Sequence, residues 1–159
     1  MSYAHFDDEH DNGQLSKLRE RLSGEVRMQT GHEFRIFQDR NDIEWGANWE
    51  KRVDQALDAA TLLLVIITPN FFESSYCKSE VARFHAREQA LNRCDLILPV
   101  YYVSAAVFDN PDKRRRHAHA RLLASRQYAD WGKLRFEPLD SLITRKAIEL
   151  LALRVKANF

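Results

Sequence analysis

The sequence predicts an α/β fold, in which helices cover both faces of an open parallel sheet. Apolar residues recur at helical spacing in several separate stretches of the chain. Between these stretches lie short apolar runs, and the longest, at 62–67, is typical of a strand buried on both faces. Strands and helices that alternate along a chain favour parallel pairing through right-handed crossovers. We therefore expect one sheet to organise the whole chain.

Composition limits the class of protein. The chain has 159 residues, 45% of them hydrophobic, and a formal net charge of +1. A chain of this length buries about two-thirds of its unfolded surface, so we expect a single domain over 1–159. The balanced charge gives no overall attraction to nucleic acid, and no apolar run approaches the ~20 residues of a membrane span. Cys77 and Cys94 form neither a zinc motif nor a disulfide framework, which suits the cytoplasm.

The first half of the chain contains two helical patterns and one clear strand. A helix that ends at Gly24 or Gly31 is predicted by apolar residues three and four apart: Leu15, Leu18, Leu22 and Val26. We expect a short strand at 34–37 and a second helix over 49–60. The apolar run 62–68 does not alternate and stops before Pro69, so it should lie in the middle of the sheet.

The second half continues the alternation. A third helical face is predicted by Cys77, Val81, Phe84 and Leu91, and a further strand by 96–103. We expect a charged helix within 109–128, a short edge strand at 131–136 and a closing amphipathic helix over 142–155. Asp140 is the expected N-cap of the closing helix.

Ligands of such sheets bind beyond the carboxyl ends of the strands, where the strand order reverses. In the flavodoxin-like order, segments 2–10 and 69–76 should meet at this crevice. Glu80 lies near the start of the following helix, whose dipole favours an ionised carboxylate. Compensation of that dipole alone explains Glu80 equally well. Tyr76 lies four residues earlier on the same helical face, and an aromatic ring beside a carboxylate suits a flat heterocycle attached to a sugar.

Three other side chains allow two interpretations. Trp45 stands next to Gly46 in the polar stretch 38–48, where it is either a binding residue or part of the core. His5 is either a titratable site residue or an ordinary loop histidine. Cys77 begins an apolar helical series, so we interpret it as a packed cysteine rather than a nucleophile.

Three motifs resemble the signatures of TIR domains. Ser2-Tyr3-Ala4-His5 resembles box 1, and Asp39 followed seven residues on by Gly46 resembles the BB loop. Ser75-Tyr76-Cys77-Lys78-Ser79-Glu80 resembles the Ser-x-Trp-Cys-x-x-Glu motif. The likeness extends over nearly the whole chain, including 96–102 and 130–131. It implies a flavodoxin-like fold and self-association through the BB loop. In bacterial, plant and some animal members it also implies cleavage of NAD at the nicotinamide–ribose bond.

The resemblance assigns roles residue by residue. Glu80 matches the catalytic glutamate, and Tyr76 matches the aromatic residue that precedes it. Tyr3 and His5 fall on box 1 positions that line the NAD pocket, while Asp39 and Trp45 fall on BB-loop positions. NAD is then the substrate, and no cofactor or metal is implied. Bacterial members act in immune defence, often beside a regulatory module, which this sequence does not contain.

Two features depart from the family pattern. The first strand is truncated or very short, because Met1 directly precedes box 1. Tyr76 replaces the usual tryptophan and offers a smaller stacking surface.

Two other functions compete with NAD cleavage. One is a non-enzymatic TIR adaptor that works only by homotypic assembly. The other is a phosphoacceptor receiver with Mg²⁺ held by Asp7 and Asp8, but Thr68-Pro69-Asn70 puts no aspartate at the end of the central strand. The basic run 113–116 is interpreted as a solvated helix face, because no aromatic residues interleave with its charges.

Overall fold

The computed structural model describes residues 1–34, 36 and 62–158. No helix in this part of the chain is long and apolar enough to cross a membrane. The regular elements, in chain order, are α1 (His5–His10), α2 (Gln14–Thr30), β1 (Leu63–Ile67), α4 (Pro69–Glu73), α5 (Ser75–Leu91), β2 (Ile97–Tyr101), α6 (Ala106–Asp109), α7 (Pro111–Arg116), α8 (Ala118–Ala124), β3 (Ala129–Asp130), the 3₁₀ turn η1 (Leu134–Phe136) and α9 (Leu142–Lys156).

The described strands form a parallel sheet in the order β1-β2-β3, with Leu63 paired to Ile97 at the start of β1. On the other side of β1, Ser2 forms a single parallel bridge to Val65. The Ser2 N–H donates to the Leu64 carbonyl over 2.8 Å, and the Ser2 carbonyl accepts from the Ile66 N–H over 2.9 Å. The expected short first strand is therefore one bridge long, and β1 lies inside the sheet as predicted.

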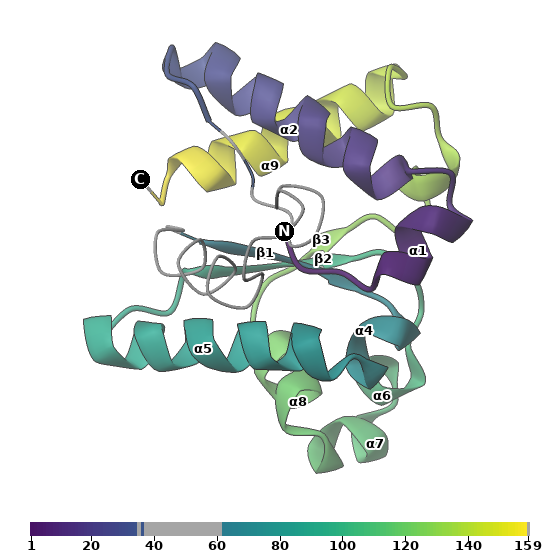
Figure 1. The fold of residues 1–159 in the computed structure, drawn as a ribbon, viewed down its shortest axis with the longest axis vertical. Helices are drawn as coiled ribbons and strands as arrows, with labels where there is room; N and C mark the ends of the chain where they lie inside the picture. Colours follow the sequence, from purple (N-terminus) through teal and green to yellow (C-terminus); the bar gives the residue numbers. More distant parts are fainter. Residues whose placement is uncertain (35, 37–61, 159) are drawn as a thin grey trace, which may run out of the picture.

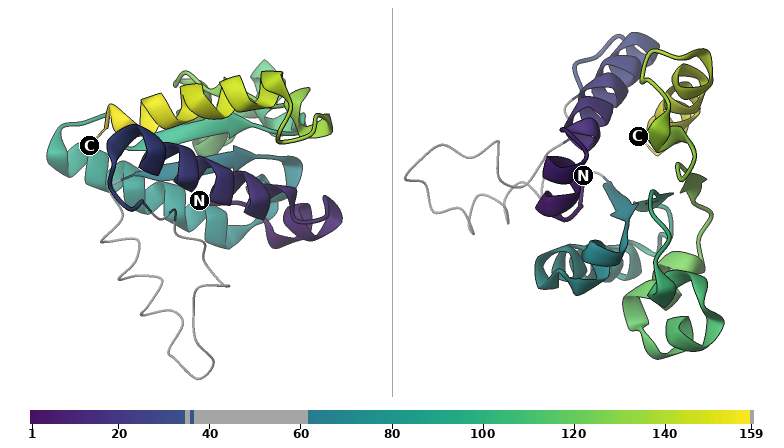
Figure 2. Two further views of the ribbon diagram at one scale, coloured as in Figure 1. Left: turned by 90° about the horizontal axis from the view of Figure 1, so that it is seen from above. Right: turned by 90° about the vertical axis from the view of Figure 1, so that its right-hand side faces the viewer.

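Helices cover both faces of this sheet, which confirms the predicted architecture (Figure 1). Helices α2 and α9 lie side by side over one face, and α5 and α8 lie under the other (Figure 2). The side chains of β1 alternate between the two layers, as the pleat of a strand requires. Leu64 and Ile66 join the α2–α9 core, whereas Leu63, Val65 and Ile67 join the α5 core.

Several predicted boundaries agree with the structure. Helix α2 runs through Gly24 and ends at Gly31, whose φ of +74° is the left-handed conformation common just after a helix. Helix α5 buries Cys77, Val81 and Phe84 as its spacing predicts. Leu91, however, is exposed, and Glu88 takes its expected place on the buried face.

The prediction of a single charged helix within 109–128 is wrong. Two short helices, α7 and α8, occupy this region, and a polar side chain begins each of them. The Asn110 side chain accepts hydrogen bonds from the N–H groups of Asp112 and Lys113, with Pro111 in the first turn of α7. His117 then caps α8 by accepting from the Ala120 N–H over 3.3 Å. Both residues start a new helix where the charge pattern alone indicated continuity.

Three smaller expectations also need correction. The last strand lies at Ala129–Asp130, and the predicted range 131–136 instead holds the buried Trp131 and the turn η1. Helix α9 is capped by Ser141, which accepts from the Thr144 N–H, rather than by Asp140. Of the strand expected at 34–37, the described residues 34 and 36 are irregular. The helix expected over 49–60 lies outside the described residues.

Candidate functional site

Glu80 lies in the second turn of α5, on the side of the helix that faces the protein. The helix begins with a Ser74 cap, whose hydroxyl accepts from the Cys77 N–H over 3.2 Å. Glu80 is only 3% exposed, among the few buried charged residues of the described chain. Because the helix dipole acts mainly within the first turn, its support for a charged Glu80 is weaker than the sequence suggested. Dipole compensation is therefore a poor explanation for this residue.

Tyr76 and Cys77 precede Glu80 and anchor the helix start. Tyr76 is half-buried and packs against the α5 core, one helical turn before Glu80. Cys77 is buried in the same core. The interpretation of Cys77 as a packed cysteine is thereby confirmed.

The box 1 residues lie where the N-terminal segment leaves the sheet. Tyr3 is buried in the α2–α9 core, and burial raises the pKa of Tyr3 to about 12, with Asp8 adding to the rise and a Ser16 hydrogen bond opposing it. His5 starts α1, and its ring centroid lies 6.1 Å from that of Tyr3. Tyr3 is thus fixed and neutral, while His5 is more accessible.

The two segments expected at the crevice do meet. The Thr68 hydroxyl donates to one oxygen of Asp7 over 2.6 Å, and the Asn70 amide donates to the other over 2.6 Å. This joins α1 to the end of β1 and the start of α4. A cavity of about 250 Å³ opens beside the junction, at the carboxyl edge of the sheet. Neither Glu80 nor Tyr76 lines it.

The neighbouring Asp8 forms hydrogen bonds to the start of α2 instead of to the β1 loop. One of its oxygens accepts from the N–H groups of Leu15 and Ser16, and the other accepts from the Ser16 hydroxyl. Asp8 thus holds the first turn of α2, while Asp7 holds the β1 loop. The two carboxylates do not form the joint Mg²⁺ site of a receiver, and the described residues contain no cluster of three metal ligands.

Asp39 and Trp45, the predicted BB-loop residues, lie outside the described residues. Of the six site residues predicted from the sequence, the structure therefore describes four. Tyr76 and Glu80 share one helix, and Tyr3 and His5 share the segment beyond the Ser2 bridge.

Sequence reasoning missed a second buried glutamate on α5. Both carboxylate oxygens of Glu88 accept from Arg126, one of them over 2.9 Å, and Glu88 also accepts from the N–H groups of Leu96 and Ile97. Arg126 further donates to the Cys94 carbonyl. This group fixes the start of β2 against α5. The sequence pattern that could have revealed Glu88 is the helical spacing 77, 81, 84, 88, which puts residue 88 on the buried face of α5.

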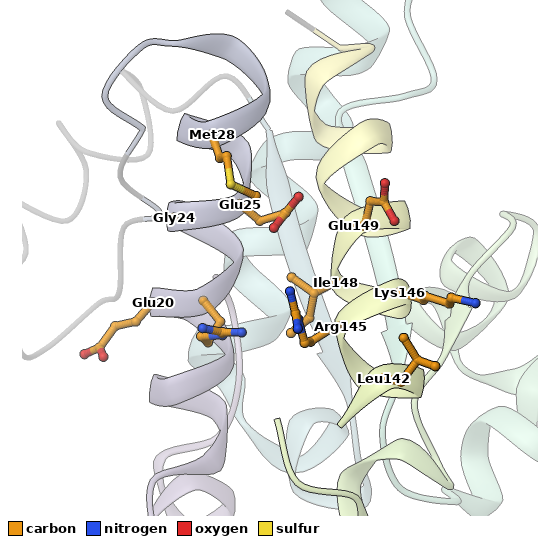
Figure 3. A pocket seen from close by; sticks show the side chains of 10 residues that line it. Glu20, Gly24, Glu25, Met28, Leu142, Arg145, Lys146, Ile148 and Glu149 are labelled. Atoms are coloured by element: carbon orange, nitrogen blue, oxygen red, sulfur yellow. The ribbon is translucent and has the colours of Figure 1, made fainter. Parts of the chain in front are cut away.

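An open groove of about 670 Å³ lies between α2 and α9 (Figure 3). Its walls carry charges of both signs, with Glu20 and Lys146 pointing away on opposite sides and Arg145 turned toward α2. No aromatic side chain lines it, so it offers a nicotinamide or adenine ring no stacking surface. We do not assign the dinucleotide to this groove.

Comparison with known proteins agrees with this arrangement. No curated protein matches the chain. A family model for the TIR domain matches residues 1–143, which covers the Ser2 bridge, β1, the Ser75–Glu80 motif on α5 and the buried Trp131. A match over most of the chain, on a parallel sheet with helices on both faces, shows that this chain belongs to the TIR-domain family.

Proposed function

We propose that this TIR domain cleaves NAD at the nicotinamide–ribose bond, with Glu80 as the catalytic carboxylate. One observation carries the proposal: Glu80 ends the Ser75–Glu80 motif and is buried at 3% exposure, beside a partly accessible Tyr76. Charged side chains are almost never fully buried unless they are paired. A carboxylate shielded from water also acts more strongly on a developing positive charge than an exposed one.

The chemistry needs only one carboxylate. Ordinary glycosidases use a carboxyl pair, because an alkoxide leaving group must be protonated as it departs. The nicotinamide of NAD is already cationic, so it takes the electrons of the breaking bond and leaves neutral. Glu80 then stabilises the oxocarbenium-like ribose or holds its hydroxyl groups, and Tyr76 and Trp45 stack on the rings. Attack by water gives ADP-ribose, and attack by the adenine of the same molecule gives a cyclic product.

The test is nicotinamide release from NAD by the purified chain over a series of protein concentrations. We expect Glu80→Gln to lower the rate at least 100-fold, about the size of losing one electrostatic group at a catalytic centre. Glu73→Gln is the matched control, since Glu73 is an exposed glutamate at the end of α4. Circular dichroism must show both variants folded. A folded Glu80→Gln variant with the parental rate would refute the assignment.

A second function, homotypic assembly without catalysis, has its own support in α9. This helix buries Ile148, Leu151 and Val155 on one side. Large aliphatic side chains stand exposed on its opposite side: Leu142, Ile143, Leu150 and Leu153. An apolar stripe that no described residue covers indicates an interaction surface.

The partner that fits this stripe is a second copy of the chain. The adjoining α2–α9 groove carries Glu20, Glu25 and Glu149 together with Arg21, Arg145 and Lys146. With three acidic and three basic side chains, this surface is neutral overall and can complement a second copy of itself.

Sedimentation velocity over a concentration series tests the assembly. We expect Leu150→Glu to shift the chain toward monomer, while Leu91→Glu, at an exposed leucine on α5, leaves association unchanged. Equal sedimentation of all three proteins would contradict the α9 surface. Assembly without nicotinamide release at any concentration would favour the adaptor over the enzyme.

A further inference from the structure

The cavity at the carboxyl edge of the sheet holds chemistry that the proposed NAD site does not use. It lies between α1, the Thr68–Asn70 turn, the end of β2 and η1, and its volume is about 250 Å³. The four described residues assigned to NAD cleavage, Tyr3, His5, Tyr76 and Glu80, do not line it. Its occupant is therefore a separate question from the reaction at Glu80.

Arg135 gives the cavity a cation without a counterion in the described structure. Its guanidinium carbon lies 5.3 Å from the centre of the Tyr102 ring and 4.8 Å from that of Phe136. Its Nε is buried and has no hydrogen-bond partner. Because Nε has almost no accessible surface, an anion in the cavity contacts the guanidinium through its terminal nitrogens. A phosphate suits the planar fork of a guanidinium better than a single-point acceptor does.

Phe6 gives the cavity an aromatic surface on α1. Its side chain is 62% exposed, although it is a large apolar ring. The ring lies nearly parallel to that of His10, with an interplanar angle of 11° and centroids 5.6 Å apart. One face of the Phe6 ring is thus turned to His10. Exposed aromatic rings held in this way are stacking platforms for nucleic-acid bases.

Asp11 adds an acceptor between the cation and the ring pair. The Tyr102 hydroxyl donates to one of its oxygens over 2.6 Å, which fixes the carboxylate at the cavity wall. The other oxygen has no donor among the described residues. It is therefore available to a ligand hydroxyl or amino group, such as those of a ribose or an adenine.

We propose that this cavity binds a purine nucleoside monophosphate. Arg135 binds the phosphate, Asp11 accepts from the ribose or the exocyclic amine, and the Phe6–His10 pair stacks on the base. The volume supports a mononucleotide rather than a dinucleotide, since 250 Å³ falls just below the roughly 300–1,000 Å³ typical of small-molecule sites. An aromatic carboxylate would leave Asp11 without a donor, so it fits less well.

Isothermal titration calorimetry with AMP tests the site. We expect saturable binding with a Kd below about 1 mM. Adenosine and inorganic phosphate, each lacking one half of the recognition, should bind at least tenfold more weakly. Phe6→Ala should weaken AMP binding about fivefold or more. Because Phe6 is exposed, this variant keeps the core intact, which guards against an effect of misfolding.

Two arginine variants locate the phosphate. Arg135→Met keeps an apolar side chain under the rings and should weaken AMP at least tenfold, but should leave the weak binding of adenosine unchanged. Arg115→Met, at an exposed arginine of α7, should leave both affinities unchanged. Equal loss of AMP and adenosine binding in Arg135→Met would contradict the phosphate contact. Absence of AMP binding up to several times that Kd would overturn the proposal.

Glu80→Gln separates this site from the reaction. AMP affinity should be the same in Glu80→Gln as in the parent chain, whether or not nicotinamide release is lost. If Glu80→Gln weakens AMP as strongly as Arg135→Met does, AMP occupies the substrate site, and the separate nucleotide site is refuted. A catalytically silent parent chain that still binds AMP would refute only the NAD reaction.

Discussion

Replacing Arg126 with methionine would leave the Glu88 carboxylate buried without its counterion. The two side chains are only 12% and 2% exposed, so water cannot replace the lost partner. Breaking one member of a buried pair costs about 3–5 kcal/mol. A domain of this size loses roughly 2–4 °C of Tm for each kcal/mol, so we expect Tm to fall by about 6–20 °C.

Thermal unfolding followed by circular dichroism measures this shift, and two further variants test its cause. Glu88→Gln in the Arg126→Met background removes the buried charge but keeps an oxygen that accepts from Leu96 and Ile97, so it should recover part of the lost Tm. Arg115→Met removes an ion pair whose partners are 74% exposed and should change Tm little. If Arg126→Met shifts Tm no more than Arg115→Met, the reasoning is refuted.

Two further predictions concern the α9 cap and Tyr3. Ser141→Ala should lower the free energy of unfolding by about 1 kcal/mol, because it removes the acceptor of the Thr144 N–H. Asp140→Ala should lower it clearly less. Chemical denaturation compares the two variants, and a larger loss for Asp140→Ala would contradict the assigned cap. Tyr3 has a folded pKa of about 12 against an ordinary value of 10, so its stabilising contribution is complete below pH 10 and is lost as the pH rises from 10 through 12. Urea unfolding over this range should show the parent chain losing stability relative to Tyr3→Phe, and parallel curves would exclude the effect.

The sequence predicted the parts of the fold that hydrophobic spacing controls. The central strand and the buried faces of α2 and α5 follow from residue periodicity, because burial of an apolar stripe dominates their energetics. Spacing could not show that 109–128 divides into two helices, since that depends on the Asn110 and His117 side chains accepting hydrogen bonds from backbone N–H groups. Nor could it show that only two residues of β3 pair with β2, because pairing is decided by the partner strand.

The candidate site was predictable to a similar degree. The motif placed Tyr76 and Glu80 on one helical face, and the strand order brought segments 2–10 and 69–76 together. Residue spacing could not show that Glu80 lies outside the cavity formed there, since this depends on how α5 packs beneath the sheet. The structural role of Glu88 could not be predicted for a related reason. A glutamate on a buried face needs a partner, and the partner of Glu88, Arg126, lies 38 residues away in the sequence.

The two cores differ in how much of the chain must be synthesised before each can form. The described residues of the α5 core lie between Leu63 and Leu123, so they are all synthesised before α9. The α2–α9 core joins Leu15 and Leu18 to Leu151 and Val155 and cannot close until α9 has been synthesised. Until then α2 presents its apolar stripe to the surroundings, where chaperones and neighbouring nascent chains compete for it. Loss of α9 by a premature stop would thus leave one layer of the protein able to form and the other permanently open.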